Sequence, residues 1–258
     1  MSCVLLRIAV CLLAAAGAVG AEPDRVTALG RLEPEGGVVV VSGPSLPVVV
    51  LEELHVVEGA RVARGDPLAT LDGRGRAEAD VAIARAELAR AEKHLERANR
   101  LARGSAASDA TREDAESDVE IARAQLMGAK SELRLSRVLA PVGGRVLEIH
   151  TRAGELRDPR GILELGDTDA MMVVAEVYET DVVHVRPGQE AVITSPALAA
   201  PLRGTVARVG LMIGKQDVLD SDPVARTDAR VVEVEILIEE GPDVSALTYL
   251  QVHVEIAR

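Results

Sequence analysis

The fold is decided by residues 81–133, which have the sequence VAIARAELARAEKHLERANRLARGSAASDATREDAESDVEIARAQLMGAKSEL. Apolar residues recur here at alternating spacings of three and four, once before the small-residue segment 104–108 and once after it. This spacing is typical of helices that bury one narrow stripe against each other. The predicted seam consists of Val81, Ala84, Leu88, Ala91, Leu95 and Ala98 in the first arm and Ala115, Val119, Ala122, Leu126, Ala129 and Leu133 in the second.

The two stripes mirror each other about residues 106–107, so large side chains face large ones if the arms fold back there. Alanine then faces alanine between the large pairs, which lets the two helix backbones approach closely. Arms of about 28 residues would extend roughly 40 Å. The pattern predicts an antiparallel coiled-coil hairpin, and the expected large pairs are Val81 with Leu133, Leu88 with Leu126 and Leu95 with Val119.

The remaining faces of the two arms are charged, with 13 Lys or Arg and 12 Asp or Glu between Arg74 and Arg137. Little apolar surface is therefore expected outside the seam, and the hairpin is predicted to project into solvent. The alternative is a helical pair that lies against a larger core, because amphipathic helices of globular domains carry the same stripe.

Composition excludes several classes of function. The chain has 258 residues, of which 48% are hydrophobic, and is large enough for more than one domain. It has no Phe or Trp, only two Tyr, and a formal net charge of −12, so nucleic-acid binding is not expected. The sequence has no nucleophile elbow, phosphate-binding loop or general-base arrangement. We therefore expect neither enzymatic activity nor a cofactor.

The first 21 residues have the pattern of a secretory signal. Arg7 precedes an apolar run over 8–20, and small residues lead up to Ala21. The run is short for a membrane span, although an uncleaved N-terminal anchor is the alternative. Both cysteines, Cys3 and Cys11, lie in this segment, so a cleaved chain would have no thiol. The protein is expected to be exported.

Two segments on either side of the predicted hairpin resemble each other at an offset of 95 residues. In each, alternating apolar residues lead to a turn glycine and then to a short apolar strand. This internal repeat predicts one small β domain whose halves are separated by the helical arms. The matching residues are Glu53 and Glu148, His55 and His150, Gly59 and Gly154, Leu68 and Leu163, and Asp72 and Asp167.

The two segments also resemble the halves of a biotinyl/lipoyl carrier domain, the first over residues 51–72 and the second over 137–154. A carrier presents a lysine for its cofactor at the turn between the halves, whereas this chain has Asp72–Gly73–Arg74 there. A carrier protein of an acyl-transfer or carboxylation enzyme is therefore the less favoured alternative. The lysines of the chain are Lys93, Lys130 and Lys215.

A split lipoyl-like domain, a helical hairpin and a following β-barrel together resemble the HlyD-type membrane fusion proteins, which are periplasmic adaptors. The sequence is most similar to the DevB-type adaptors of ABC exporters, through GRLEP at 30–34, ILELGDT at 162–168, AEVYETD at 175–181 and DARVVEV at 228–234. The resemblance implies a mainly β fold with a long α-helical hairpin. It divides the chain into a signal peptide or anchor (1–21), N-terminal strands that join the barrel (22–46), the first lipoyl-like half (47–73), the coiled-coil hairpin (74–137), the second lipoyl-like half (138–168), and a β-barrel with a membrane-proximal domain (169–258).

The resemblance implies an adaptor in the periplasm, associated with the inner membrane. Its expected partners are an inner-membrane ABC permease with its ATPase and a TolC-like outer-membrane channel, and its expected state is a hexamer. An adaptor of a proton-driven (RND-type) pump is the alternative.

The same resemblance assigns docking to the channel to Arg100, Leu101 and Ser108 at the hairpin tip. Arg112 departs from the family pattern, because an apolar residue usually stands there. On its own, Ser108 also fits the N-cap of the second helix, and Arg100 fits a solvated charge.

Two further clusters are not expected to bind metal. Asp217, Asp220 and Asp222 lack the ligand spacing of a calcium loop and are predicted to form a solvated acidic turn. His55 and His150 occupy equivalent positions of the repeat, but no cysteine or carboxylate pattern in the sequence joins them.

Overall fold

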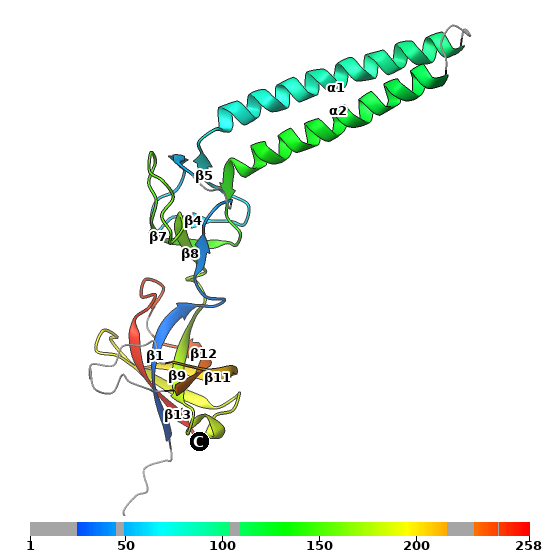
Figure 1. Ribbon diagram of the computed structural model, residues 1–258. Helices are drawn as coiled ribbons and strands as arrows, with labels where there is room; N and C mark the ends of the chain where they lie inside the picture. The colour runs from blue at the N-terminus through cyan, green and yellow to red at the C-terminus, as the bar shows by residue number, and fades with distance from the viewer. Residues whose placement is uncertain (1–24, 45–48, 104–108, 216–229, 242) are drawn as a thin grey trace, which may run out of the picture. The chain divides into compact units, whose positions relative to one another are not determined.

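The computed structural model describes residues 25–44, 49–103, 109–215, 230–241 and 243–258 (Figure 1). The chain divides into two compact units. One consists of Met1–Gly30, Ala175–Gly241 and Val252–Arg258, and the other of Arg31–Val174 and Pro242–Gln251. The signal or anchor predicted for residues 1–21 and the acidic turn predicted around Asp217 lie outside the described residues.

Six strands form a closed barrel in the order β1-β13-β10-β11-β12-β9, in which β10 pairs antiparallel with β11 and β13, and β11 pairs antiparallel with β12. Along β1 and β13 every second residue is buried and the residues between are exposed or half-buried, because successive side chains of a strand point to opposite faces. The aliphatic residues on the inner face, such as Val254 and Ile256, therefore fill the barrel. The strands are β1 (Arg25–Pro34), β9 (Met171–Tyr178), β10 (Glu190–Thr194), β11 (Leu202–Lys215), β12 (Arg230–Glu240) and β13 (Gln251–Ala257), with the short helix η1 (Val182–His184) between β9 and β10.

Two small sheets share a second aliphatic core, which includes Leu51, Leu68, Val146 and Leu163. One sheet has the order β2-β8-β7-β4 and the other the order β3-β5-β6. Their strands are β2 (Val39–Val41), β3 (Leu51–Leu54), β4 (Arg61–Val62), β5 (Pro67–Leu71), β6 (Arg137–Leu139), β7 (Gly144–Ile149) and β8 (Leu163–Gly166).

The internal repeat is visible in the pairing of these strands. β3 pairs with β5 so that Glu53 faces Thr70, and β7 pairs with β8 so that Glu148 faces Glu164. Each pair also has a register shift just before its glutamate, between Leu51 and Glu53 in one and between Val146 and Glu148 in the other. The offset of 95 residues therefore relates the two strand pairs and their bulges.

Strand β2 differs from its predicted position. The sequence placed residues 22–46 with the barrel, but β2 pairs with β8, and only β1 joins the barrel. Gly36 and Gly37 follow β1 with φ angles of 87° and 78°. A residue with a β-carbon is disfavoured in this backbone region, so the two glycines let the chain turn sharply before β2 begins.

Helix α1 (Arg74–Arg103) and helix α2 (Asp109–Leu135) lie side by side along their lengths (Figure 1). With 30 and 27 residues they are about 45 and 40 Å long. They connect β5 to β6, two neighbouring strands that pair through Thr70 and Arg137. Within the described part of the chain, no helix is both long enough and apolar enough to cross a bilayer.

Candidate functional site

The two helices pack through their aliphatic stripes. Near the sheets, Val81 and Ala84 of α1 form one cluster with Leu126 of α2, and Leu88, Ala129 and Leu133 pack against it. Because residues early in α1 meet residues late in α2, the helices run antiparallel. Toward the other end Ala98 and Ala115 are almost completely buried, Val119 is buried and Leu95 is half-buried. Each of the twelve seam positions is thus buried or half-buried.

The flanks of the helix pair carry more apolar surface than the sequence suggested. Ile83 and Leu101 of α1 and Ile121 and Met127 of α2 are each more than half exposed. They lie outside the spacing of threes and fours, so the helix partner does not cover them. The expectation of little apolar surface outside the seam is therefore wrong at these four positions.

The end of the pair farthest from the sheets presents arginine and leucine. Arg100 Nη1 donates to Glu96 Oε1 at 3.2 Å, and both side chains are largely exposed. Leu101, the next residue, is 53% exposed. Arg100 also lies in the last turn of α1, where a cation interacts favourably with the helix dipole. Ser108 lies outside the described residues.

Arg112 stands in the first turns of α2, at the position where the family resemblance expects an apolar residue. Its Nη1 donates to Glu116 Oε1 at 2.5 Å, four residues further along the helix. The departure from the family pattern is therefore accommodated by a local ion pair. Such exposed pairs contribute little to stability, so Arg112 remains free to meet a partner.

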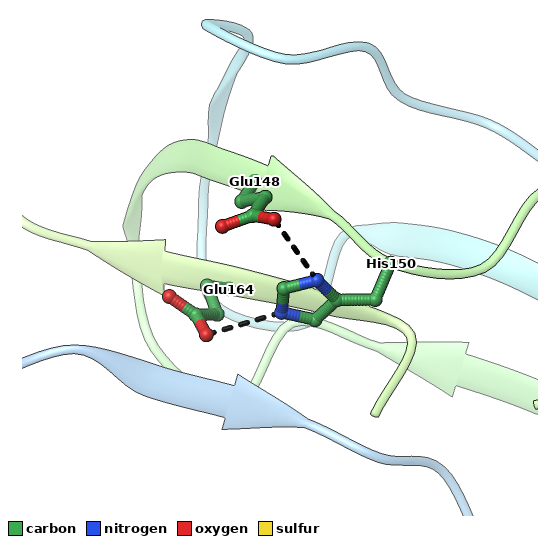
Figure 2. Close-up of side chains that lie close together, drawn as sticks. All are labelled: Glu148, His150 and Glu164. Carbon is green, nitrogen blue, oxygen red and sulfur yellow. Dashed lines mark hydrogen bonds and ion pairs between the residues drawn. The ribbon is translucent and has the colours of Figure 1, made fainter. Parts of the chain in front are cut away.

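The two equivalent histidines follow strands of different sheets and have different partners. His55 Nε2 lies 2.8 Å from Thr70 Oγ1. His150 lies between two carboxylates: its Nδ1 is 3.3 Å from Glu148 Oε1 and its Nε2 is 3.1 Å from Glu164 Oε1 (Figure 2). The sequence pattern showed no carboxylates joining the two histidines, and the structure places two carboxylates around His150 alone.

The sequence did contain a signal for this arrangement. Because antiparallel strands bring residues into opposition, Glu148 and Glu164 become neighbours once β7 and β8 pair. The part of the set that is visible in the sequence is Glu148 and His150, two positions apart. A scan for ligands close together in sequence cannot find such a set.

An ion pair at the edge of the four-stranded sheet shifts the titration of a carboxyl group. Both terminal nitrogens of the Arg61 guanidinium donate to the carboxylate of Asp169, the longer of these bonds joining Nη2 and Oδ1 at 2.5 Å. These hydrogen bonds hold the pKa of Asp169 below its usual value and raise that of Arg61. The pair ties strand β4 to the loop that follows β8.

Comparison with known proteins identifies relatives by sequence. No family model matches the chain. The macrolide export protein MacA of Escherichia coli O157:H7 is 38% identical over 68 residues, which cover 25% of this chain and 18% of that protein. The pyoverdine export membrane fusion protein PvdR of Pseudomonas aeruginosa is 34% identical over 207 residues of alignment, which cover 68% of this chain and 52% of that protein. The chain thus spans about half, or less, of these relatives.

A solved structure shows the same fold over most of the chain. It is the MacA–MexA chimeric protein that contains the Pseudomonas aeruginosa MexA α-hairpin domain. The match has a TM-score of 0.74 and covers 92% of this chain and 81% of that one. At 22% sequence identity, it is evidence of fold alone.

Proposed function

This chain belongs with the membrane fusion proteins, to which it is related in sequence and fold, and we propose that it is a periplasmic adaptor of a tripartite export system. It would link an inner-membrane ABC permease and its ATPase to a TolC-like outer-membrane channel. The observation that carries this function is the antiparallel helix pair, about 40 Å long, inserted between two neighbouring strands of a β domain. A rod of this kind extends the reach of a small domain without adding a catalytic site.

The two small sheets are best interpreted as the halves of a lipoyl-like domain. In support, they share one core, and their strand pairs repeat the same register shift at an offset of 95 residues. A carrier function is opposed by the turn itself. Asp72 and Gly73 lead directly into α1, while Lys93 and Lys130 lie within the helices and Lys215 ends β11.

Docking to the channel is assigned to Arg100, Leu101 and, from the sequence alone, Ser108. The guanidinium of Arg100 has a planar set of donors that can bond to exposed carbonyl oxygens at the helix ends of a partner. Its ion pair with Glu96 is solvent-exposed, so breaking it on docking costs about 0–1 kcal/mol. Leu101 would then fill an apolar groove beside it.

A hexamer is proposed as the working state, with six hairpins forming a tube. The exposed apolar residues on the flanks of the helix pair, Ile83, Ile121 and Met127, support lateral contacts between copies. Export through the segment 1–21, as a cleaved signal or a retained anchor, would place the protein in the periplasm at the inner membrane.

The alternative transporter is a proton-driven pump of the RND type. The similarity to DevB-type adaptors in segments such as 175–181 favours the ABC class. The two classes differ in the protein at the inner membrane, so the identity of the co-purifying transporter distinguishes them.

Site-specific photo-crosslinking in the native host tests the adaptor function. A crosslinking residue at Leu101 is expected to capture an outer-membrane channel, with an ABC permease co-purifying. The matched control is Ile83, which lies 18 positions earlier in α1, about 27 Å away, and is similarly exposed, at 58% against 53% for Leu101. The same channel captured equally from both positions would refute tip docking. Recovery of soluble acyltransferase or carboxylase subunits would overturn the adaptor function in favour of the carrier.

A further inference from the structure

Strands β7 and β8 bring two carboxylates face to face. Glu148 and Glu164 are direct partners in the antiparallel pair. Like charges directly opposite each other on adjacent strands repel and destabilise the sheet. A cation held between the two side chains would remove that repulsion.

His150 places a nitrogen ligand at the same point. Its side chain is only 2% exposed and lies between the two glutamates (Figure 2). Nε2 is 3.1 Å from Glu164 Oε1. Nδ1 is 3.3 Å from Glu148 Oε1, but it is buried and, among the described residues, no atom is positioned to complete a hydrogen bond with it. A buried polar atom without such a partner is costly, and its position beside the Glu148 carboxylate suits an additional ligand.

From this geometry we infer that Glu148, His150 and Glu164 bind a divalent first-row transition-metal ion of the Zn²⁺ type. One atom from each residue lies within 4.8 Å of the other two. Zn²⁺ binds imidazole nitrogen and carboxylate oxygen at about 2.0–2.2 Å. The Glu148 side chain is 56% exposed, so it is free to rotate toward an ion held by the other two ligands.

The backbone around His150 is held in place before any ion binds. The His150 amide donates to the Ile162 carbonyl at 2.9 Å. The hydroxyl of the next residue, Thr151, donates to the Gly161 carbonyl at 2.9 Å and accepts from the Asp158 amide at 3.0 Å. These bonds close the loop between β7 and β8, so the imidazole is presented from a fixed position.

Arg160 is the cation that competes for this site. Its Nη1 lies 3.6 Å from Glu148 Oε1, while its Nε donates to Asp158 Oδ1 at 3.2 Å. The side chain is largely exposed. When a metal ion binds Glu148, Arg160 can therefore keep its hydrogen bond to Asp158. Moving the Arg160 side chain away from Glu148 requires no repacking of the core.

The other half of the repeat supplies a natural comparison. Glu53 and His55 correspond to Glu148 and His150, but the residue that faces Glu53 is Thr70, a neutral hydroxyl, where the second half has Glu164. His55 Nδ1 is 3.7 Å from Glu53 Oε1, farther than its counterpart. With one carboxylate in place of two, the His55 half is expected to bind the ion far more weakly.

Calorimetric titration of the purified full-length chain with ZnCl₂ tests the site. We expect saturable binding of one ion per chain, weakened about tenfold or more by Glu164→Gln and by His150→Gln. His55→Gln should leave the affinity unchanged. Zn²⁺ should also raise the melting temperature of the unsubstituted chain and of His55→Gln, but not that of Glu164→Gln, because a ligand that binds only the folded state stabilises it.

The exposed ligand keeps the test decisive if a buried substitution impairs folding. Glu148→Gln changes a side chain outside the core, and it should weaken binding as Glu164→Gln does while leaving the circular dichroism spectrum unchanged. The metal site is refuted if the unsubstituted chain shows no saturable binding. It is equally refuted if Glu148→Gln binds as tightly as the unsubstituted chain, or if His55→Gln abolishes binding.

Discussion

The seam of the helix pair can be tested by comparing two adjacent residues of α2. Leu126 is 9% exposed and packs on Val81 and Ala84, whereas Met127 is 70% exposed. Leu126→Ala removes three carbon atoms, and at about 0.8 kcal/mol for each buried methylene the expected loss is about 2 kcal/mol. This lies at the lower end of measured Leu→Ala effects, because the seam is only two helices thick.

Met127→Ala is the matched control. Leucine and methionine have similar helix propensities, so replacement by alanine changes the intrinsic stability of the helix almost equally at the two positions. The exposed site should change the free energy of unfolding by no more than about 0.5 kcal/mol. Urea unfolding followed by circular dichroism at the helical band measures both variants.

The outcome separates a packed seam from two independently stable helices. A loss of about 2 kcal/mol confined to Leu126→Ala supports the seam. Equal effects of the two substitutions, or an effect of Leu126→Ala below about 0.5 kcal/mol, would refute the packing of α1 on α2 through this stripe.

Four further substitutions address the tip, the ion pair, the repeat domain and a helix of the hairpin. Arg100→Asp should abolish export while the circular dichroism spectrum and oligomeric state stay unchanged, and normal export would contradict docking through the tip. Because Arg61 lowers the pKa of Asp169 in the folded chain, the pair stabilises the fold above the ordinary Asp pKa, and this contribution disappears as the pH falls through the lowered value. The stability difference between the unsubstituted chain and Asp169→Asn should therefore shrink on acidification in urea unfolding, whereas a difference independent of pH would exclude the ion pair as its cause. Gly144→Ala should destabilise the chain by more than about 1 kcal/mol, because φ is 153° and an added Cβ would lie 2.5 Å from a carbonyl oxygen of β8. Gly128→Ala, inside α2 with no atom within 4 Å of the added Cβ, should stabilise it by about 0.5–1 kcal/mol, and thermal unfolding that ranks the two glycine variants otherwise would contradict both assignments.

The helical pair was accessible to sequence reasoning because its signal is local. The spacing of Val81, Leu88 and Leu95 depends only on helix geometry, and three to four residues complete a turn wherever the helix lies. The exposed residues Ile83 and Ile121 were missed because a stripe pattern says which face is buried, without saying that the other faces are polar. Individual facing pairs, such as Leu95 with Val119, stay predictions.

In the β domains, local sequence patterns do not determine which strands become neighbours. The three valines at 39–41 favour a strand, but apolar strands of this kind are interchangeable as neighbours until the whole sheet forms. The chain therefore had no local signal that β2 pairs with β8 and not with the barrel. The turn at Gly36 and Gly37 redirects the chain after β1, and β2 then pairs with β8.

By itself, the sequence determined the helix pair, the internal repeat and the relationship to the membrane fusion proteins, because each depends on the spacing of residues and short motifs along the chain. Only the tertiary structure decided which residues of distant segments meet. Glu148 and His150 are two residues apart, but Glu164 joins them through the register of β7 on β8 and the loop that holds His150. Strand register is set by the burial of a shared core, here around Val146 and Leu165, and that burial involves the whole domain at once.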